Sequence, residues 1–290
     1  MSSISISIEY LKSSIDEYDF KKQKKPIIIG LSGPQGSGKS YLAEHLTKQL
    51  QTTYEHLNFV QFSMDDLYLK HVDQVKLNDS DNLLLRGRGL PGTHDINIGV
   101  KIFDQLINSH NNNEDFPIII PTYDKSAFNG EGDRFDSSNW KIIDKPVDVI
   151  IFEGWFNGFE PLDEDQLRLS YLTSEPSGIV QHHKLYHLEQ INESLKQYQA
   201  IWKLFDKFIF IHTTDINNVY TWRIQQEHAL IKLTGRGMTD DKIVKFVDRY
   251  MPMYHLYYER MCDKGVVKTT GNNLRLSIDI ERNITKSTII

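Results

Sequence analysis

The chain has 290 residues, of which 33 are basic and 39 acidic, so its formal net charge is −6. Hydrophobic residues make up 39% and charged residues 25%, a globular composition that argues against the disordered, collagen-like and membrane classes. The excess of acidic residues also argues against a protein that binds nucleic acid or an anionic membrane over a broad basic surface. It does not exclude a local anion site. The single cysteine, Cys262, excludes an internal disulfide and a cysteine-based zinc cage, and it suits the reducing cytosol.

Residues 1–25 are rich in serine and isoleucine and then in lysine, and we expect them to form a peripheral helix or a loose arm. The first ten residues have no basic region, so we expect no secretory signal. The apolar runs of the chain are far shorter than the ~18 residues of a membrane helix. We therefore expect a cytoplasmic protein that spans no membrane. The basic tract at residues 21–25 leaves additional nuclear presence open.

Short apolar, β-branched runs alternate along the chain with segments of helical spacing. The runs with the composition of buried strands are residues 26–31, 58–62, 117–120, 147–152 and 208–212. Helical spacing fills residues 96–107, 187–205, 215–233 and 239–250, and Thr93 or Asp95 could cap the first of these helices. This alternation predicts an α/β fold with a doubly wound parallel sheet flanked by helices, formed by residues 26–290 as one domain. The long polar stretch at residues 121–146 is expected to be a functional or disordered loop.

A phosphate-binding motif follows the first predicted strand directly and precedes a helical pattern. Its residues match G-x-x-x-x-G-K-[ST] in full and are Gly33, Pro34, Gln35, Gly36, Ser37, Gly38, Lys39 and Ser40. The glycines let backbone N–H groups approach phosphate, and the helix that follows adds its positive N-terminal end. Lys39 is expected to reach the β- and γ-phosphates and the Ser40 hydroxyl to bind Mg²⁺.

An acidic residue is also needed at the end of a neighbouring strand, to organise Mg²⁺ and water. Glu153 occupies that place, directly after the run at residues 147–152. Ligands bind at the carboxyl ends of parallel strands, so this position favours a role in the site. The alternative for Glu153 is a solvent-facing residue at the strand end. The chain has no Asn-Lys-x-Asp tetrapeptide of the kind that recognises guanine, so ATP is the expected nucleotide.

A second motif, Ser63-Met-Asp-Asp-Leu-Tyr68, follows the second predicted strand. It resembles the Ser-x-Asp-x-Phe-Tyr element of the uridine kinase, phosphoribulokinase and pantothenate kinase superfamily. The resemblance implies that Asp65 is the base that receives the proton of the acceptor hydroxyl, with Asp66 a weaker alternative. A carboxylate beside the γ-phosphate site would orient the attacking oxygen. On spacing alone, Asp65 could instead cap the turn that follows it.

Further motifs resemble the D-glycerate 3-kinase family, and most closely its fungal branch of ATP-dependent kinases whose acceptor is not established. They are residues 88–95, 121–134, 152–159, 222–227, 237–241 and 246–254. The resemblance runs from about residue 27 to about residue 258. It implies two substrate loops, at about residues 84–95 and 121–146, and a helical lid region at about residues 215–260. Residues 160–187 depart from the family pattern, and if they bordered the acceptor pocket the acceptor could differ from glycerate.

Several charged and polar residues lie in these implied substrate loops and in the lid. The residues we assign to acceptor binding are Arg88, His94, Asp95, Lys125, Arg134, Arg223 and Arg236. Arginine suits bidentate binding of carboxylate or phosphate, but each arginine taken singly could equally be a solvated surface residue. His94 could equally be a neutral loop histidine.

The sequence therefore predicts a Mg²⁺- and ATP-dependent kinase for a small, anionic acceptor such as glycerate. Lys39, Asp65 and Glu153 are the predicted catalytic residues, and Ser40 and Glu153 the predicted magnesium ligands. Two alternatives stay open: a nucleotide-binding regulatory protein of kinase fold without turnover, and a kinase of uridine or pantothenate.

Overall fold

The computed structural model describes residues 2–110, 116–176, 178–235 and 237–290. Its centre is a six-stranded sheet in the order β10-β9-β8-β1-β7-β2, in which all neighbours are parallel except β10. The strands are β1 (Ile27–Ser32), β2 (Phe59–Ser63), β7 (Val149–Gly154), β8 (Lys207–His212), β9 (Asn273–Ile278) and β10 (Ile284–Ile289). The predicted α/β class with a mostly parallel sheet is confirmed.

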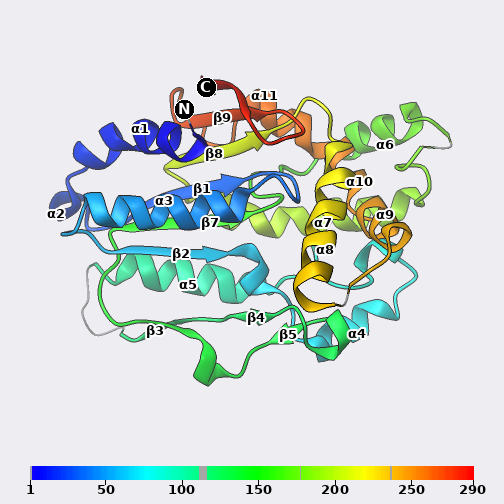
Figure 1. The fold of residues 1–290 in the computed structure, drawn as a ribbon, viewed down its shortest axis with the longest axis horizontal. Coiled ribbons are helices and arrows are strands. Elements are labelled where there is room, and N and C mark those ends of the chain that lie inside the picture. Colours follow the sequence, from blue (N-terminus) through cyan, green and yellow to red (C-terminus); the bar gives the residue numbers. More distant parts are fainter. Residues whose placement is uncertain (1, 111–115, 177, 236) are drawn as a thin grey trace.

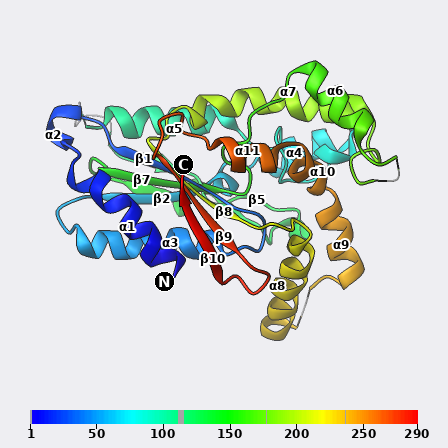
Figure 2. The same cartoon turned by 90° about the horizontal axis from the view of Figure 1, so that it is seen from above.

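Helices cover both faces of this sheet, as seen from above in Figure 2. One face carries α1 and α3 and the other carries α5 and α7, while α8 and α9 project beyond the carboxyl ends of the strands (Figures 1 and 2). The longer helices are α1 (Ser3–Asp16), α3 (Lys39–Thr53), α4 (His71–Asn78), α5 (Ile96–Asn108), α6 (Glu164–Thr173), α7 (Leu185–Trp202), α8 (Asn218–Thr234) and α9 (Asp240–Asp248). The shorter ones are α2 (Phe20–Gln23), α10 (Met251–Met253) and α11 (Glu259–Lys264). Among the described residues, no helix combines the length and apolar character needed to cross a membrane.

The two central strands explain why functional residues meet at one edge of the sheet. All six residues of β1 and all six of β7 are buried, as expected for parallel strands covered on both faces. In the register of the sheet, Glu153 lies opposite both Leu31 of β1 and Ser63 of β2. The phosphate loop that follows β1 and the motif that follows β2 therefore emerge on either side of Glu153.

The segment expected to be a long loop contains short strands instead. Within this segment β4 (Tyr123–Asp124) pairs with β5 (Asp133–Arg134), and β6 (Lys141–Ile143) pairs with β3 (Ile118–Ile120), which lies in the strand predicted at residues 117–120. Each pair forms its own antiparallel sheet. The alternation that a strand of two or three residues shows is too short to detect in a sequence. These small sheets hold residues 121–134 near the carboxyl end of β2 (Figure 1).

Two other regions contain structure that the sequence pattern did not indicate. The divergent segment at residues 160–187 includes α6. Its N-cap residue Asp163 accepts a hydrogen bond from the backbone N–H of Gln166. The antiparallel hairpin of β9 and β10 extends the sheet beyond β8. At the other end of the chain, residues 3–16 form the helix α1, whose Leu11 and Ile15 are buried.

Candidate active site

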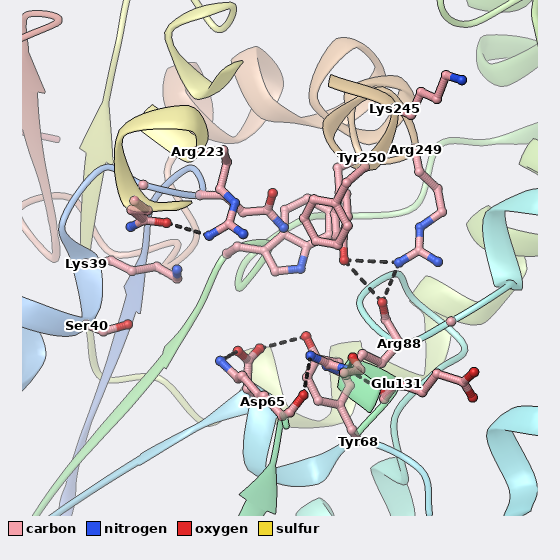
Figure 3. Close-up of a pocket in the computed structure, with 18 residues that line it drawn as sticks. Lys39, Ser40, Asp65, Tyr68, Arg88, Glu131, Arg223, Lys245, Arg249 and Tyr250 are labelled. Carbon is pink, nitrogen blue, oxygen red and sulfur yellow. Dashed lines mark hydrogen bonds and ion pairs between the residues drawn. The ribbon is translucent and has the colours of Figure 1, made fainter. Parts of the chain in front are cut away.

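A cavity of about 550 Å³ opens at the carboxyl ends of β1 and β2, beneath α8 and α9. Its lining combines the phosphate loop, the motif after β2, the two predicted substrate loops and the lid region (Figure 3). The lining residues with ionisable side chains are Lys39, Asp65, Tyr68, Arg88, Lys125, Glu131, Arg223, Lys245, Arg249 and Tyr250. None of the described residues of the divergent segment 160–187 lines this cavity.

The phosphate loop (residues 33–40) connects β1 to α3, and its glycines are needed for its shape. Gly36 and Gly38 have φ values of 81° and 92°, which residues with a side chain rarely adopt. A Cβ atom on Gly36 would lie 2.4 Å from the Trp222 Cβ atom of α8. The loop can therefore pass close to α8 only because glycine stands at this position.

Two contacts from distant parts of the chain fix the loop further. The backbone N–H of Gln35 donates to the Tyr254 hydroxyl at 3.0 Å, and Arg282 Nε donates to the Gly36 carbonyl at 2.7 Å. Arg282 lies in the turn between β9 and β10, with its guanidinium 5.4 Å from the centroid of the Trp222 ring. The Trp222 indole N–H in turn donates to the Ile280 carbonyl of the same turn at 2.7 Å. Nothing in the sequence pattern around Arg282 signalled this role.

Lys39, Ser40 and Glu153 lie at the start of α3 and the end of β7. The Ser40 hydroxyl donates to Glu153 Oε1 at 3.1 Å. Glu153 is buried, and its second oxygen, Oε2, has no hydrogen-bond partner in the part of the chain that the structure describes. A buried carboxylate oxygen without a donor is costly unless a cation or an ordered water satisfies it. The pair of Ser40 and Glu153 therefore fits the oxygen ligands that Mg²⁺ prefers.

Asp65 follows β2 and points into the cavity (Figure 3). Its Oδ1 accepts a hydrogen bond from the Tyr68 hydroxyl at 2.8 Å, and its Oδ2 lies 2.5 Å from Lys125 Nζ. Burial alone would raise the pKa of this carboxyl, but the charges of Lys125 and Lys39 outweigh it and hold the pKa at about 2. Asp65 is therefore ionised, as a proton acceptor must be.

The neighbouring Asp66 has a different place. Its Oδ2 accepts a hydrogen bond from the Ser63 amide at 2.9 Å, which closes the turn that carries Asp65. Burial raises the pKa of Asp66 to about 6, and the charges of Asp65 and Glu153 add to the effect. Asp66 shapes the turn, whereas Asp65 faces the cavity.

Arg88 and Lys125 join the two predicted substrate loops at the cavity wall. Arg88 Nη1 donates to the carbonyls of Gly130 and Glu131, and Nη2 donates to the Lys125 carbonyl at 3.3 Å. The Arg88 guanidinium thus holds the loop that carries Lys125. Both residues line the cavity, as expected for contacts with an acceptor.

His94, Asp95 and Arg134 lie behind the cavity wall, on the other side of Tyr68. The His94 ring stacks on Tyr68 with 4.5 Å between centroids, and its Nδ1 is 2.8 Å from the Tyr198 hydroxyl. Burial lowers the pKa of His94 to about 3, so the ring is neutral. Arg134 Nε donates to the Tyr68 carbonyl at 2.9 Å, and its Nη2 is 3.1 Å from Asp95 Oδ2. These three residues support Tyr68 and do not line the cavity.

Replacing Asp95 with alanine should destabilise the protein by about 2–3 kcal/mol, because the change removes both a helix N-cap and the partner of Arg134. Asp95 Oδ1 accepts from the Ile98 amide at the start of α5, and the Arg134 side chain is only 6% exposed. Asp163→Ala, which removes the N-cap of α6 alone, should cost about 1 kcal/mol. Urea unfolding of both variants measures the difference, and equal losses would show that the ion pair contributes nothing.

Of the two arginines predicted to bind the acceptor from the lid region, the structure describes only Arg223. Arg223 of α8 lines the cavity on the side of Lys39, with its guanidinium 5.3 Å from the centroid of the Phe246 ring (Figure 3). Its Nη1 donates to Gln226 Oε1. Arg236 lies outside the described residues.

Among the described residues of the lid region, five that line the cavity were not assigned to the site from the sequence: Gln226, Lys245, Phe246, Arg249 and Tyr250. Arg249 Nη2 and the Tyr250 hydroxyl both donate to the Arg88 carbonyl, which ties the segment that follows α9 to the loop that carries Arg88 (Figure 3). Trp155 packs between Tyr250 and Tyr254, with 5.2 Å between centroids in each pair. The signal was available, since residues 246–254 belong to a motif of the family resemblance.

Comparisons with known proteins identify relatives of this chain. The family model described as Zeta toxin matches residues 12–82, which include the phosphate loop and Asp65. The Schizosaccharomyces pombe protein named Uncharacterized kinase mug58 is 39% identical over 267 residues, covering 91% of this chain and 92% of that protein. Probable ATP-dependent kinase TDA10 of Saccharomyces cerevisiae is 38% identical over 284 residues, covering 96% and 93%. The solved structure of D-glycerate 3-kinase from Cryptococcus neoformans superposes with a TM-score of 0.88 at 35% identity, covering all of both chains.

Proposed function

Since the chain belongs to the family of small-molecule kinases that includes D-glycerate 3-kinase and the fungal ATP-dependent kinases, we propose that it phosphorylates a hydroxyl group of a small hydroxy acid. ATP is the proposed phosphoryl donor and glycerate the leading acceptor. The observation that carries the proposal is the position of Asp65, which faces the same cavity as Lys39 and Ser40 of the phosphate loop.

In this proposal the phosphate loop binds the nucleotide. Backbone N–H groups of the loop and the N-terminus of α3 would surround the β-phosphate, and Lys39 would contact the β- and γ-phosphates. Ser40 and Glu153 would hold Mg²⁺, which when bound neutralises charge on the phosphate oxygens. The described residues contain no cluster of three or more histidine, cysteine, aspartate or glutamate side chains suited to a metal. The remaining ligands of Mg²⁺ would therefore be phosphate oxygens and water, as is usual for this ion.

The charge of the cavity favours an anionic acceptor. Among the described residues, six basic side chains and two acidic ones line it, a formal surplus of four positive charges in a chain whose net charge is −6. The basic residues are Lys39, Arg88, Lys125, Arg223, Lys245 and Arg249, and the acidic ones are Asp65 and Glu131. A carboxylate on the acceptor, together with the phosphates of ATP, would balance this surplus.

Transfer of the γ-phosphoryl group would then depend mainly on alignment of the acceptor hydroxyl with the γ-phosphorus. The oxygen of the acceptor hydroxyl attacks the γ-phosphorus, the bond from that phosphorus to the bridging oxygen breaks, and ADP leaves with the bonding electrons. The hydroxyl proton passes to the Asp65 carboxylate and from there to water. Lys39 and Arg223 would stabilise the negative charge that accumulates on the phosphate oxygens.

The test is ADP formation by the purified protein with Mg²⁺ and ATP, measured against D-glycerate, L-glycerate, lactate, uridine and pantothenate. We expect stimulation by glycerate and a phosphorylated product in ³¹P NMR. Stimulation by uridine or pantothenate alone would replace the proposed acceptor. A protein that binds ATP but responds to no compound would support a nucleotide-binding role without turnover.

A further inference from the structure

The two oxygens of the proposed base, Asp65, are each occupied by a donor from the protein itself. Tyr68 donates to Oδ1, and the Lys125 ammonium lies 2.5 Å from Oδ2. In this state the carboxylate is a weak proton acceptor, because the adjacent cation stabilises its charge. Each oxygen keeps a second lone pair, but an attacking hydroxyl that donates to Oδ2 shares this oxygen with the ammonium, and the carboxylate becomes a stronger proton acceptor once the ammonium moves away.

Tyr68 is held in place from several sides. Its side chain is buried, it stacks on His94, and the edge of its ring meets Tyr123 with 5.1 Å between centroids. The Tyr68 carbonyl accepts a hydrogen bond from Arg134. Movement of this ring would disturb packing on each of these neighbours, so Tyr68 is not the donor that yields.

Lys125 is placed to move. Its side chain is 59% exposed, and Asp65 is the only partner of its ammonium among the described residues. The Lys125 carbonyl is anchored by Arg88, so the ammonium can swing on its four-carbon stem without movement of the backbone. Asp65 raises the pKa of Lys125, so the ammonium keeps its charge and needs an anion wherever it lies.

We propose that Lys125 makes phosphoryl transfer conditional on an anionic acceptor, by leaving Asp65 only when the acceptor's carboxylate takes its place as partner. The inference rests on the proposed kinase function and adds a specificity-determining role against water. An acceptor carboxylate gives the Lys125 ammonium a new partner, and the acceptor hydroxyl donates to the Asp65 oxygen that the ammonium has left. Water offers no such partner, and Asp65 stays paired while ATP is bound alone.

The consequence is protection of ATP in the absence of acceptor. Hydrolysis would be the same displacement with water as the attacking oxygen, giving ADP and inorganic phosphate and leaving the proton on Asp65. With Lys125 in place, Asp65 orients water poorly and draws weakly on its proton. Lys125 thus has a role that a simple acceptor-binding cation lacks.

The experiment measures release of inorganic phosphate from Mg²⁺ and ATP without any acceptor, in wild type and in Lys125→Met. We expect hydrolysis to rise about tenfold in the variant, equivalent to about 1.4 kcal/mol of transition-state stabilisation. Lys125→Arg retains the charge and should raise hydrolysis less than Lys125→Met does. Lys76→Met, which removes an exposed lysine of α4 that pairs with Asp73, is the matched control and should also stay near wild type.

The double variant Asp65→Asn with Lys125→Met identifies the source of the gain. Its hydrolysis should fall to the level of Asp65→Asn alone, because the gain needs a free carboxylate. Hydrolysis in Lys125→Met at or below the wild-type rate would overturn the inference, and Lys125→Gln repeats the measurement if the methionine variant loses ATP binding. The assay contains no acceptor, so failure of glycerate in the panel would overturn the proposed acceptor without changing this readout.

Discussion

Asp65→Asn is expected to lower the rate of phosphoryl transfer by about 10²–10⁴-fold, the usual contribution of a positioned general base. Asparagine has nearly the same shape and can keep the hydrogen bond from Tyr68, but its amide cannot accept the proton of the acceptor. ATP should bind nearly as in wild type, because Asp65 is not part of the phosphate loop. The measurements are kcat with glycerate and the dissociation constant of ATP from calorimetry.

Asp73→Asn is the control for this change. Asp73 lies on α4, where its carboxylate is exposed and pairs with Lys76. It should leave kcat and ATP binding unchanged. An Asp65→Asn protein that transfers phosphate at the wild-type rate would remove Asp65 from the mechanism.

Lys39→Met should lower kcat/KM for ATP by about 100-fold or more, the loss typical of removing one donor that stabilises transition-state charge. The lysine is the first residue of α3, and its side chain lines the cavity between Asp65 and Arg223 (Figure 3). The methionine side chain has nearly the length of the lysine side chain but carries no charge that could contact the phosphates. Steady-state kinetics with ATP varied at fixed glycerate gives the value.

Lys48→Met offers a comparison on the same helix. Lys48 is 69% exposed and pairs with Glu44, so its loss should change kcat/KM little. If Lys39→Met kept wild-type kinetics, the phosphate loop would have no part in the reaction.

The central sheet and the phosphate loop could be predicted because their signals are local. The buried runs that became β1 and β7 are continuous and apolar, and the glycine motif between β1 and α3 requires one backbone shape. β9 and β10 were not indicated, because β10 mixes polar and apolar residues at the edge of the sheet. α6 is a surface helix of 10 residues with a single buried residue, Leu167, which gives a weak periodic pattern.

Within the site, the sequence placed residues on loops but could not show their depth. Arg88 and Arg134 both belong to motif loops, yet one lines the cavity and the other lies behind Tyr68. The pair of Lys125 and Asp65 joins residues sixty positions apart and depends on how the strands β4 and β5 dock beside β2. These are outcomes of tertiary packing that no single-sequence pattern contains.

The hydrogen bond from Arg282 to Gly36 has a consequence for synthesis of the protein on the ribosome. The phosphate loop is made long before the guanidinium that holds its carbonyl, because Gly36 and Arg282 are 246 positions apart in the sequence. The carbonyl of Ile280, which fixes the Trp222 ring beside Gly36, arrives equally late. A nascent chain that stops before this turn carries the nucleotide motif without the contacts that set its shape. The nucleotide site is therefore completed only after translation has passed residue 282, and a shorter nascent chain is expected to hold ATP more weakly than the finished protein.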